Sequence, residues 1–445
     1  MLHIVVFGAG RSAGYFIDYM FHLCKSHNWK LTIADQHTEH LEELFSGYLN
    51  AQLIKADVIN AKERESIISD ANWVVSMLPA FMHTLVAKDC LRLGVNMATA
   101  SYESDEMRAM RSEIEAKGLQ FINECGLDPG IDHMSAMRII DILHAKGAII
   151  TSFKSYCGGL VAQESIDNPW GYKFSWNPRN VIIAGQGTAK YLENGRLKFK
   201  PYSRLYREPD TIHFANGTMY DGYPNRDSLS YKGIYGLNEI KTMVRGTLRH
   251  IGYCRAWNIF VQLGLTDDSY TFPLSGSTTY YDFFEAFLPG KGDDLKSRLV
   301  EFMGSDYEPA SIEKILWTGI AENITIPLKG NHSPAFILQD LLERKWKLQP
   351  QDRDLVVMQH MFEYTLNGIN MQFSSSLHIE GENNIKTAMG KTVGIPLAIS
   401  LKNLLLGNCT QKGLLLPVIP ALYAPVLNEL ENDFNIRFEE IENEI

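Results

Sequence analysis

The segment His3-Ile-Val-Val-Phe-Gly-Ala-Gly-Arg-Ser-Ala-Gly14 decides the fold of the first part of the chain. Its apolar strand runs directly into a glycine-rich turn, and an amphipathic stretch, Tyr15–His27, follows. Gly8 permits the tight bend, Gly10 lets the backbone approach a pyrophosphate, and Ala13 allows close helix packing. The N–H groups at the start of the helix face the same anion. The segment therefore predicts the strand, turn and helix of a dinucleotide site.

Strand signals recur after this turn, with helix-like segments between them. Six strands alternating with helices predict a Rossmann-type doubly wound parallel sheet over residues 1–127. The later strands are expected at Lys30–Ala34, Gln52–Ala56, Trp73–Met77, Asn96–Thr99 and Leu119–Ile122.

Asp35, at the end of the second expected strand, is the residue that bears on the choice of cofactor. An acid at this position accepts hydrogen bonds from the adenosine ribose and repels a 2′-phosphate, so NAD is favoured over NADP. Arg11 is the nearby cation that would offset the repulsion. The alternative is that Asp35 only begins a surface turn. Asp57 with Val58, and Leu78, close the next two strands at the edge where the cofactor lies, or they serve loop packing.

At Gly126-Leu-Asp-Pro-Gly-Ile-Asp-His133 the alternating pattern stops. This turn-forming segment precedes an expected helix, Ile131–Ala145, with Asp132 as its N-cap. A strand over Ile149–Tyr156 then leads into a glycine-rich turn at Cys157-Gly-Gly159. We therefore expect a second domain to begin at residue 128.

The second domain, expected over residues 128–389, is rich in aromatic residues, Gly and Pro, which predicts a sheet-based α+β structure. Helical periodicity marks a subregion at about 280–350. Asn367-Gly368 separates two strand-like runs and predicts a two-residue hairpin between Val356–Leu366 and Ile369–Glu380.

Composition excludes several functional classes. The 445 residues carry a net charge of -10 without a Lys/Arg run, so no nucleic-acid partner is expected. Six cysteines without a CxxC pair indicate reduced thiols in the cytoplasm and no metal site. The N-terminus lacks the features of a signal peptide, and the apolar stretch Gly413–Leu427 is short and interrupted by prolines, so no membrane role is expected.

Arg226, Arg245 and Arg249 stand close together in a region with few other motifs. Because arginine binds carboxylates bidentately, three of them suit a substrate with several carboxylates. Interdomain salt bridges are the alternative for each.

At these residues the sequence resembles the glutamate-forming saccharopine dehydrogenases, also called saccharopine reductases, over nearly its whole length. The shared motifs are Ala100-Ser-Tyr102, Asn123-Glu124, Gly126–His133, Ser155-Tyr-Cys-Gly-Gly-Leu160, Asp167-Asn-Pro169, Gly171-Tyr-Lys-Phe-Ser-Trp176, Tyr223-Pro-Asn-Arg-Asp227 and Arg245-Gly-Thr-Leu-Arg249.

The resemblance implies an oxidoreductase of lysine metabolism that acts on a CH–NH group. Saccharopine would be oxidised reversibly with NAD(P) and hydrolysed to L-glutamate and 2-aminoadipate 6-semialdehyde. The resemblance also implies a return to the first domain at about 390–445 and a homodimer formed through the second domain.

Carried over by motif, the resemblance implies two sets of binding residues. The implied substrate contacts are Ser101, Tyr102, Asp128, Arg226, Thr247, Leu248 and Arg249, and Arg245 is added to them from the arginine cluster described above. The implied cofactor neighbours are Gly8, Ala9, Gly10, Arg11, Ser12, Asp57, Val58, Ala100, Ser101, Leu127, Asp128, Pro129 and Ser175.

The reaction needs a base, because the amine must be neutral and water must lose a proton. Asp128 is the first candidate, Cys157 the second, and Tyr102 is the third member of the expected catalytic set. The alternatives are a turn cap for Asp128 and inert packing for Cys157.

Two departures from the family pattern stand out. The fungal members are NADP enzymes with an Arg after the second strand, where this chain has Asp35-Gln36. After Gly159 the family's Leu-Pro-Ala-Pro-Glu is replaced by Leu160-Val-Ala-Gln-Glu164. Two other functions stay open: a carboxynorspermidine synthase-like oxidoreductase, which needs acids to bind a diamine, and a non-catalytic NAD-binding redox sensor, which would not need the Arg cluster.

Overall fold

The chain folds into two compact units in a computed structural model. Unit 1 comprises Met1–Gly147 and Ile385–Phe438, and unit 2 comprises Ala148–Asn384 and Glu439–Ile445. The structure describes residues 1–10, 12–292, 294–306 and 308–445.

The first segment of unit 1 ends at Gly147, whereas the sequence predicted a first domain that ends at residue 127. One helix explains the difference. Helix α7 (Ile131–Ala145) packs against α16 (Pro420–Asp433), so it stays with unit 1. The Tyr423 hydroxyl of α16 donates to the Asp141 carboxylate of α7 at 2.6 Å and joins the two helices.

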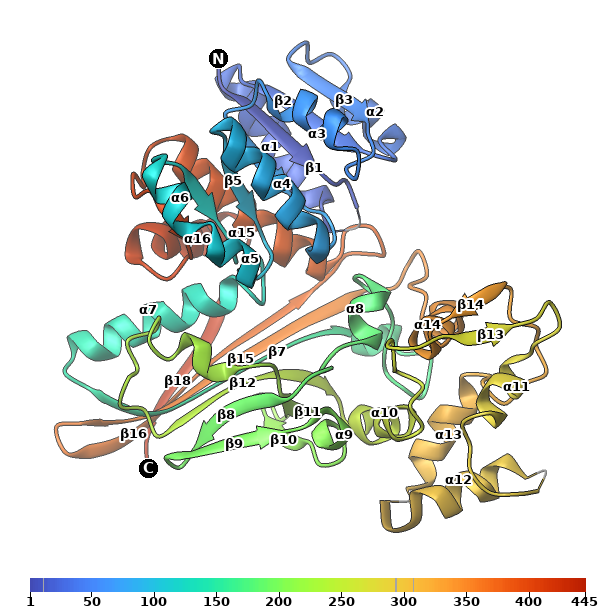
Figure 1. The fold of residues 1–445 in the computed structure, drawn as a ribbon. Coiled ribbons are helices and arrows are strands. Elements are labelled where there is room, and N and C mark those ends of the chain that lie inside the picture. Colours follow the sequence, from blue (N-terminus) through green and yellow to red (C-terminus); the bar gives the residue numbers. More distant parts are fainter. Residues whose placement is uncertain (11, 293, 307) are drawn as a thin grey trace. The chain divides into compact units, whose positions relative to one another are not determined.

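Unit 1 is built on a parallel sheet in the order β17-β6-β5-β4-β1-β2-β3, of which Figure 1 labels β5, β1, β2 and β3. β1 and β4 are parallel neighbours, and the chain adds strands outward from β1 on one side and from β4 on the other. This strand order is that of the Rossmann fold, which confirms the predicted doubly wound sheet. The seventh strand, β17, was missed because it is short and follows a turn in a proline-rich stretch. The strands are β1 (His3–Phe7), β2 (Lys30–Asp35), β3 (Ala51–Lys55), β4 (Trp73–Ser76), β5 (Asn96–Thr99), β6 (Gln120–Ile122) and β17 (Gly413–Leu415).

Helices cover both faces of this sheet. The helices of unit 1 are α1 (Gly14–His27), α2 (Glu42–Phe45), α3 (Ala61–Ile68), α4 (Ala80–Leu93), α5 (Asp105–Ala109), α6 (Arg111–Ala116), α7, α15 (Ala388–Leu405) and α16. On β1, Ile4 and Val6 pack against α1 and α15, whereas Val5 and Phe7 pack against α3 and α4. Burial on both faces explains why this strand reads as a continuous apolar run.

Unit 2 contains a nine-stranded mixed sheet in which β10-β11-β12-β7-β15-β16-β18 form the main path (Figure 1). Asn367 and Gly368 have positive φ of 52° and 83° and join β15 to β16, which confirms the predicted hairpin. The strands are β7 (Ile149–Val161), β8 (Ala189–Glu193), β9 (Arg196–Lys200), β10 (Asp210–His213), β11 (Met219–Pro224), β12 (Thr242–His250), β15 (Asp354–Leu366), β16 (Ile369–Glu380) and β18 (Phe438–Glu444).

The glycine pair at 158 and 159 corrects one prediction. A turn was expected there, but β7 continues as a strand to Val161. A Cβ added at Gly158 would lie 2.6 Å from the carbonyl oxygen of Leu248 on β12. Glycine is therefore required at this position by close approach between two strands, not by a bend.

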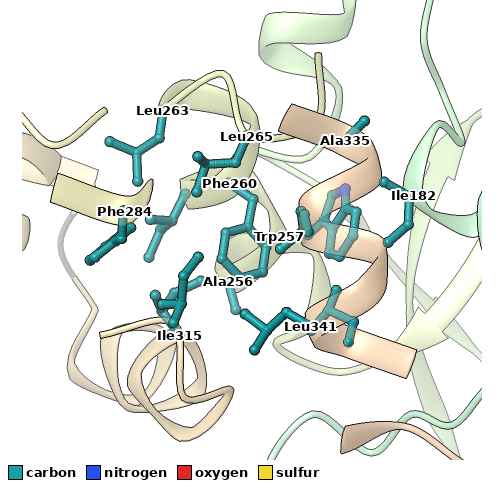
Figure 2. Packing of buried hydrophobic residues seen from close by; sticks show 14 of the residues in the cluster. Ile182, Ala256, Trp257, Phe260, Leu263, Leu265, Phe284, Ile315, Ala335 and Leu341 are labelled. Atoms are coloured by element: carbon teal, nitrogen blue, oxygen red, sulfur yellow. The ribbon is translucent and has the colours of Figure 1, made fainter. Parts of the chain in front are cut away.

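The helical part of unit 2 packs around a large aromatic core. Figure 2 shows Trp257 and Phe260 of one helix near Ile315 and Leu341 of two others. The remaining elements of unit 2 are α8 (Pro178–Ile182), α9 (Tyr202–Leu205), α10 (Tyr253–Gln262), α11 (Tyr280–Glu285), α12 (Leu295–Met303), α13 (Pro309–Trp317), α14 (Pro334–Lys345), β13 (Phe272–Leu274) and β14 (Gly330–His332).

The six cysteines are free thiols, and each of them is buried. Within the described ranges, no helix combines the length and the apolar character that crossing a bilayer requires.

Candidate functional site

The glycine turn between β1 and α1 has the geometry of an anion cradle. Gly8 has φ of 102°, and a Cβ there would lie 2.8 Å from the Met77 carbonyl oxygen, so the tight bend needs glycine. At Gly10 a Cβ would meet no described atom within 4 Å, which leaves space beside the backbone. The α1 N-cap is Ala13, whose methyl group cannot accept from the N–H groups that follow. These residues fit a pyrophosphate. Arg11 lies outside the described residues.

Asp35 is held beside this turn by two backbone hydrogen bonds. Its Oδ2 accepts from the Ala9 N–H at 2.7 Å and its Oδ1 from the His37 N–H at 2.9 Å. A carboxylate oxygen can accept more than one hydrogen bond, so both oxygens retain capacity for ribose hydroxyls. The cofactor role and the turn role are thus compatible in one side chain.

Asp57 and Val58, which were predicted at the edge of the sheet, make hydrogen bonds within their own loop. Asp57 Oδ1 accepts from the Ile59 N–H at 3.0 Å, which closes the turn before α3. The buried Val58 presents its carbonyl oxygen to Arg64 Nη1 at 2.6 Å. Leu78 is half-buried beyond β4. Their part in cofactor binding stays a prediction.

Ser101, Tyr102 and Asp128 are brought together in unit 1. The Ser101 carbonyl accepts from the Glu124 N–H at 3.0 Å, which joins the segment after β5 to the one before α7. The Tyr102 hydroxyl donates to Asp128 Oδ1 at 2.6 Å. The predicted catalytic Tyr and Asp are therefore direct partners.

The glycines around Asp128 explain why this loop is so constrained. Gly130 has φ of 149°, and a Cβ there would overlap the backbone of Gly126. Asp132 was predicted as the N-cap of α7, but the helix already begins at Ile131 and its N-cap is Gly130. Asp132 Oδ1 instead accepts from the Gly130 N–H at 2.7 Å and fixes the loop from within the first turn. Leu127, Asp128 and Pro129 are thereby presented on a rigid loop.

A buried ion-pair geometry beside this loop was missed by the sequence analysis. His133 Nε2 lies 2.8 Å from Glu124 Oε2, and both side chains are buried. Glu124 Oε1 also accepts from the Glu103 N–H at 2.9 Å. His133 and Glu124 both belong to motifs quoted in the sequence analysis, but their positions in the sequence do not show that the two side chains pair.

A second missed feature connects the ends of β4 and β5. His83 of α4 has Nδ1 2.7 Å from Ser76 Oγ and Nε2 2.7 Å from Ser101 Oγ. Its side chain is 5% exposed, and burial lowers the pKa of His83 to about 4. The imidazole is therefore neutral near pH 7, with one donor and one acceptor nitrogen.

This buried histidine predicts a pH dependence of stability. Its pKa falls from 6.5 to about 4 on folding, so between these values the unfolded chain binds more protons. The free energy of unfolding should therefore decrease as pH falls from 6.5 to 4, and this histidine should contribute up to about 3 kcal/mol of that decrease. Urea unfolding at several pH values should show a weaker decrease in His83→Gln. The same pH dependence in both proteins would contradict the prediction.

The predicted substrate residues of unit 2 lie mainly on one face of β12. Because side chains alternate along a strand, Arg245, Thr247 and Arg249 share a face. Leu248 points to the opposite face and packs in the sheet's own core. Its backbone is therefore the part of Leu248 that is nearer to the Arg249 face, and its role as a substrate contact stays a prediction.

Arg249 is a buried cation surrounded by tyrosines. It is 3% exposed, and its guanidinium carbon lies 5.5, 6.0 and 5.4 Å from the ring centroids of Tyr172, Tyr223 and Tyr253. Its Nη1 donates to the Leu248 carbonyl at 3.0 Å, but Nε has no hydrogen-bond partner and no carboxylate forms an ion pair with it among the described residues. An uncompensated buried charge is costly, so the group is suited to receive an anion.

Cys157 lies near this arginine in the sheet. It is aligned with Thr247 of β12, which is aligned in turn with Tyr223 of β11. Cys157 is buried within β7, not in the turn that was predicted, so its position is fixed by two neighbouring strands. Its catalytic role stays a prediction.

The remaining candidates of unit 2 differ in their surroundings. Arg245 stacks its guanidinium 4.4 Å from the Tyr231 ring centroid. Arg226 is exposed and has φ of 52°. Ser175 is buried, and its hydroxyl has no hydrogen-bond partner in the described structure. This hydroxyl is suited to meet a ligand atom.

Two sequence-family models match this chain. The model described as saccharopine dehydrogenase NADP binding domain matches residues 4–122, and the saccharopine dehydrogenase C-terminal domain matches residues 126–436. Together they cover most of both units.

Relatives were found among characterised proteins and solved structures. The mitochondrial alpha-aminoadipic semialdehyde synthase of Mus musculus is 33% identical over 438 residues, which is 96% of this chain and 46% of that protein. This chain thus spans about half the length of that relative. The saccharopine dehydrogenase [NADP(+), L-glutamate-forming] of Saccharomyces cerevisiae is 32% identical over 399 residues, covering 88% of this chain and 89% of that protein.

The apo structure of the L-Glu-forming saccharopine dehydrogenase from Saccharomyces cerevisiae is similar over 100% of both chains, with a TM-score of 0.86 and 29% identity. A homospermidine synthase from Legionella pneumophila, in complex with NAD, has a TM-score of 0.53 at 10% identity and covers 99% of this chain and 91% of that chain. The second similarity shows a shared fold alone.

Proposed function

Since this chain belongs to the saccharopine dehydrogenase family, we propose that it is an oxidoreductase of the L-glutamate-forming type. Saccharopine, a nicotinamide cofactor in its oxidised form and water would give L-glutamate, 2-aminoadipate 6-semialdehyde, the reduced cofactor and a proton. The observation that carries this proposal is the buried Arg249, which has no carboxylate partner among the described residues. The assay is absorbance at the reduced-nicotinamide band with saccharopine as substrate.

A bound nicotinamide cofactor would supply the hydride acceptor for the carbon that bears the secondary amine. The glycine turn and the start of α1 would hold its pyrophosphate, and Asp35 would accept from the adenosine ribose. Asp128, in contact with the Tyr102 hydroxyl, would accept the proton that the amine or the attacking water must lose. Arg249 would hold a substrate carboxylate in a site lined by tyrosines.

The polarity of the site favours this substrate over a diamine. A carboxynorspermidine synthase-like enzyme would need acids where this chain has Arg245 and Arg249. A redox sensor without catalysis would have no use for the buried charge of Arg249, which costs stability.

For the oligomer and the location we propose a homodimer formed through unit 2, in the cytoplasm. The dimer follows from family resemblance, and the location from six unpaired cysteines. Light scattering of the purified protein measures the oligomer, and a monomer at micromolar concentration would contradict it.

We also propose that NAD is preferred over NADP, although the matched family model and the yeast relative are both named for NADP. The Asp35 carboxylate stands beside Ala9 of the glycine turn. A 2′-phosphate about 4 Å away would be repelled by about 1 to 4 kcal/mol. The ratio of kcat/KM for NAD to that for NADP should therefore be at least about tenfold.

The variant that tests this preference is Asp35→Ala. It should raise kcat/KM for NADP and so lower the ratio of kcat/KM for NAD to that for NADP. Glu42→Ala serves as a control, since it removes an exposed carboxylate from α2 and should leave this ratio unchanged. Equal efficiencies with NAD and NADP in the unmodified protein would show that Asp35 acts only as a turn residue.

A further inference from the structure

The buried chain of Ser76, His83 and Ser101 carries an inference about how the substrate is held. The three side chains come from the end of β4, from α4 and from the segment after β5. Both hydrogen bonds are 2.7 Å long. Because β4 and β5 are adjacent parallel strands, His83 bridges the two strand ends at the edge where a Rossmann sheet binds its ligands.

The burial of Ser76 determines the direction of these hydrogen bonds. Its side chain is fully buried, and a buried hydroxyl must donate its proton to avoid a desolvation penalty. Among the described residues, His83 Nδ1 is the partner available to Ser76 Oγ. Nδ1 is therefore the acceptor, and in a neutral imidazole the proton then resides on Nε2.

This tautomer makes Ser101 a donor toward a ligand. His83 Nε2–H donates to Ser101 Oγ, so the Ser101 proton is not used in this bond. Ser101 is partly exposed, and no other hydrogen bond of its hydroxyl occurs within the described structure. The Ser101 O–H is thus available to a ligand as a neutral donor, the type of group from which a carboxylate oxygen accepts a hydrogen bond.

We propose that His83 is a positioning residue that holds Ser101 as a hydrogen-bond donor to a carboxylate of the substrate. The proposal rests on the proposed function, which makes saccharopine the carboxylate ligand. Ser76 also belongs to this hydrogen-bonded chain, because it determines which nitrogen of the His83 imidazole carries the proton.

A double-mutant cycle tests whether His83 acts through Ser101. His83→Leu removes the donor and should raise KM for saccharopine roughly tenfold, the loss of one hydrogen bond to a charged group. The dissociation constant of the reduced cofactor should not change. In a Ser101→Ala background, His83→Leu should have no further effect on KM. His83→Gln, whose amide N–H can replace Nε2–H, should recover most of the wild-type KM.

Two results would overturn the proposal. Additive effects of His83→Leu and Ser101→Ala on KM would show that His83 acts by supporting the fold. A parallel loss of cofactor affinity in His83→Leu would show that Ser101 serves the cofactor instead of the substrate.

The imidazole 15N spectrum gives a readout that does not require activity or the His83→Leu variant. The protein should show His83 with a protonated Nε2 and an unprotonated Nδ1, and Ser76→Ala should shift the population toward the other tautomer. A protonated Nδ1 in the unmodified protein would overturn the proposal. If saccharopine is not turned over, the proposed function fails, and the spectrum still decides the tautomer.

Discussion

Replacing Arg249 with Met is expected to lower kcat/KM for saccharopine by roughly 100-fold or more, with little change in cofactor affinity. Loss of one partner of a buried charged pair costs about 2 to 5 kcal/mol of binding energy. The same change removes a buried charge that has no carboxylate partner among the described residues, so the thermal midpoint should stay the same or rise. Reduced activity without reduced stability distinguishes a ligand site from a structural ion pair.

Two matched variants control this experiment. Arg255→Met, on α10, changes an arginine whose side chain is 61% exposed and should leave kcat/KM unchanged. Arg249→Lys keeps the positive charge but cannot bind a carboxylate bidentately. Its kcat/KM should therefore lie between those of the unmodified protein and Arg249→Met. An unchanged kcat/KM in Arg249→Met would remove this residue from the substrate site. A large fall in the thermal midpoint would assign it to the fold.

Asp128→Asn should reduce kcat by about 100-fold or more while substrate still binds. A positioned base contributes about 10²- to 10⁴-fold, and the amide keeps the size of the carboxylate without its basicity. The acidic limb of the pH–rate profile should be lost along with the rate. The measurement is kcat as a function of pH with saturating saccharopine and cofactor.

Tyr102→Phe is the matched comparison, because it removes the hydroxyl that donates to Asp128 at 2.6 Å but keeps the carboxylate. Without this donor the carboxylate is less stable as an anion, so the acidic limb should move to higher pH. If Asp128→Asn keeps the wild-type kcat and pH–rate profile, Asp128 is not the base and its role is structural.

The Rossmann sheet was predictable because its signals are local. The run from His3 to Gly14 contains the strand, the turn and the start of the helix in consecutive residues. Strand β17, in contrast, gains its structure by pairing with β6, whose residues lie about 290 positions earlier. Such short strands are stabilised by partners that periodicity does not reveal.

The candidate site was predictable only where a motif carried it. Arg249, Asp128 and the glycine turn belong to recognisable motifs, whereas His83 lies on an ordinary amphipathic helix. Its two serine partners are set by the pairing of β4 with β5. The glycine pair of β7 was misassigned as a turn, although glycine within a strand also indicates close backbone approach, which the structure shows at Gly158.

The central claim is that this chain oxidises saccharopine to release L-glutamate, and product analysis tests it most directly. Purified protein, saccharopine and NAD or NADP should give the reduced cofactor, L-glutamate and 2-aminoadipate 6-semialdehyde in equal amounts, measured by absorbance and mass spectrometry. The Arg249→Met variant should give little of any of them under the same conditions. Formation of lysine and 2-oxoglutarate, or no reduction of either cofactor, would contradict the account.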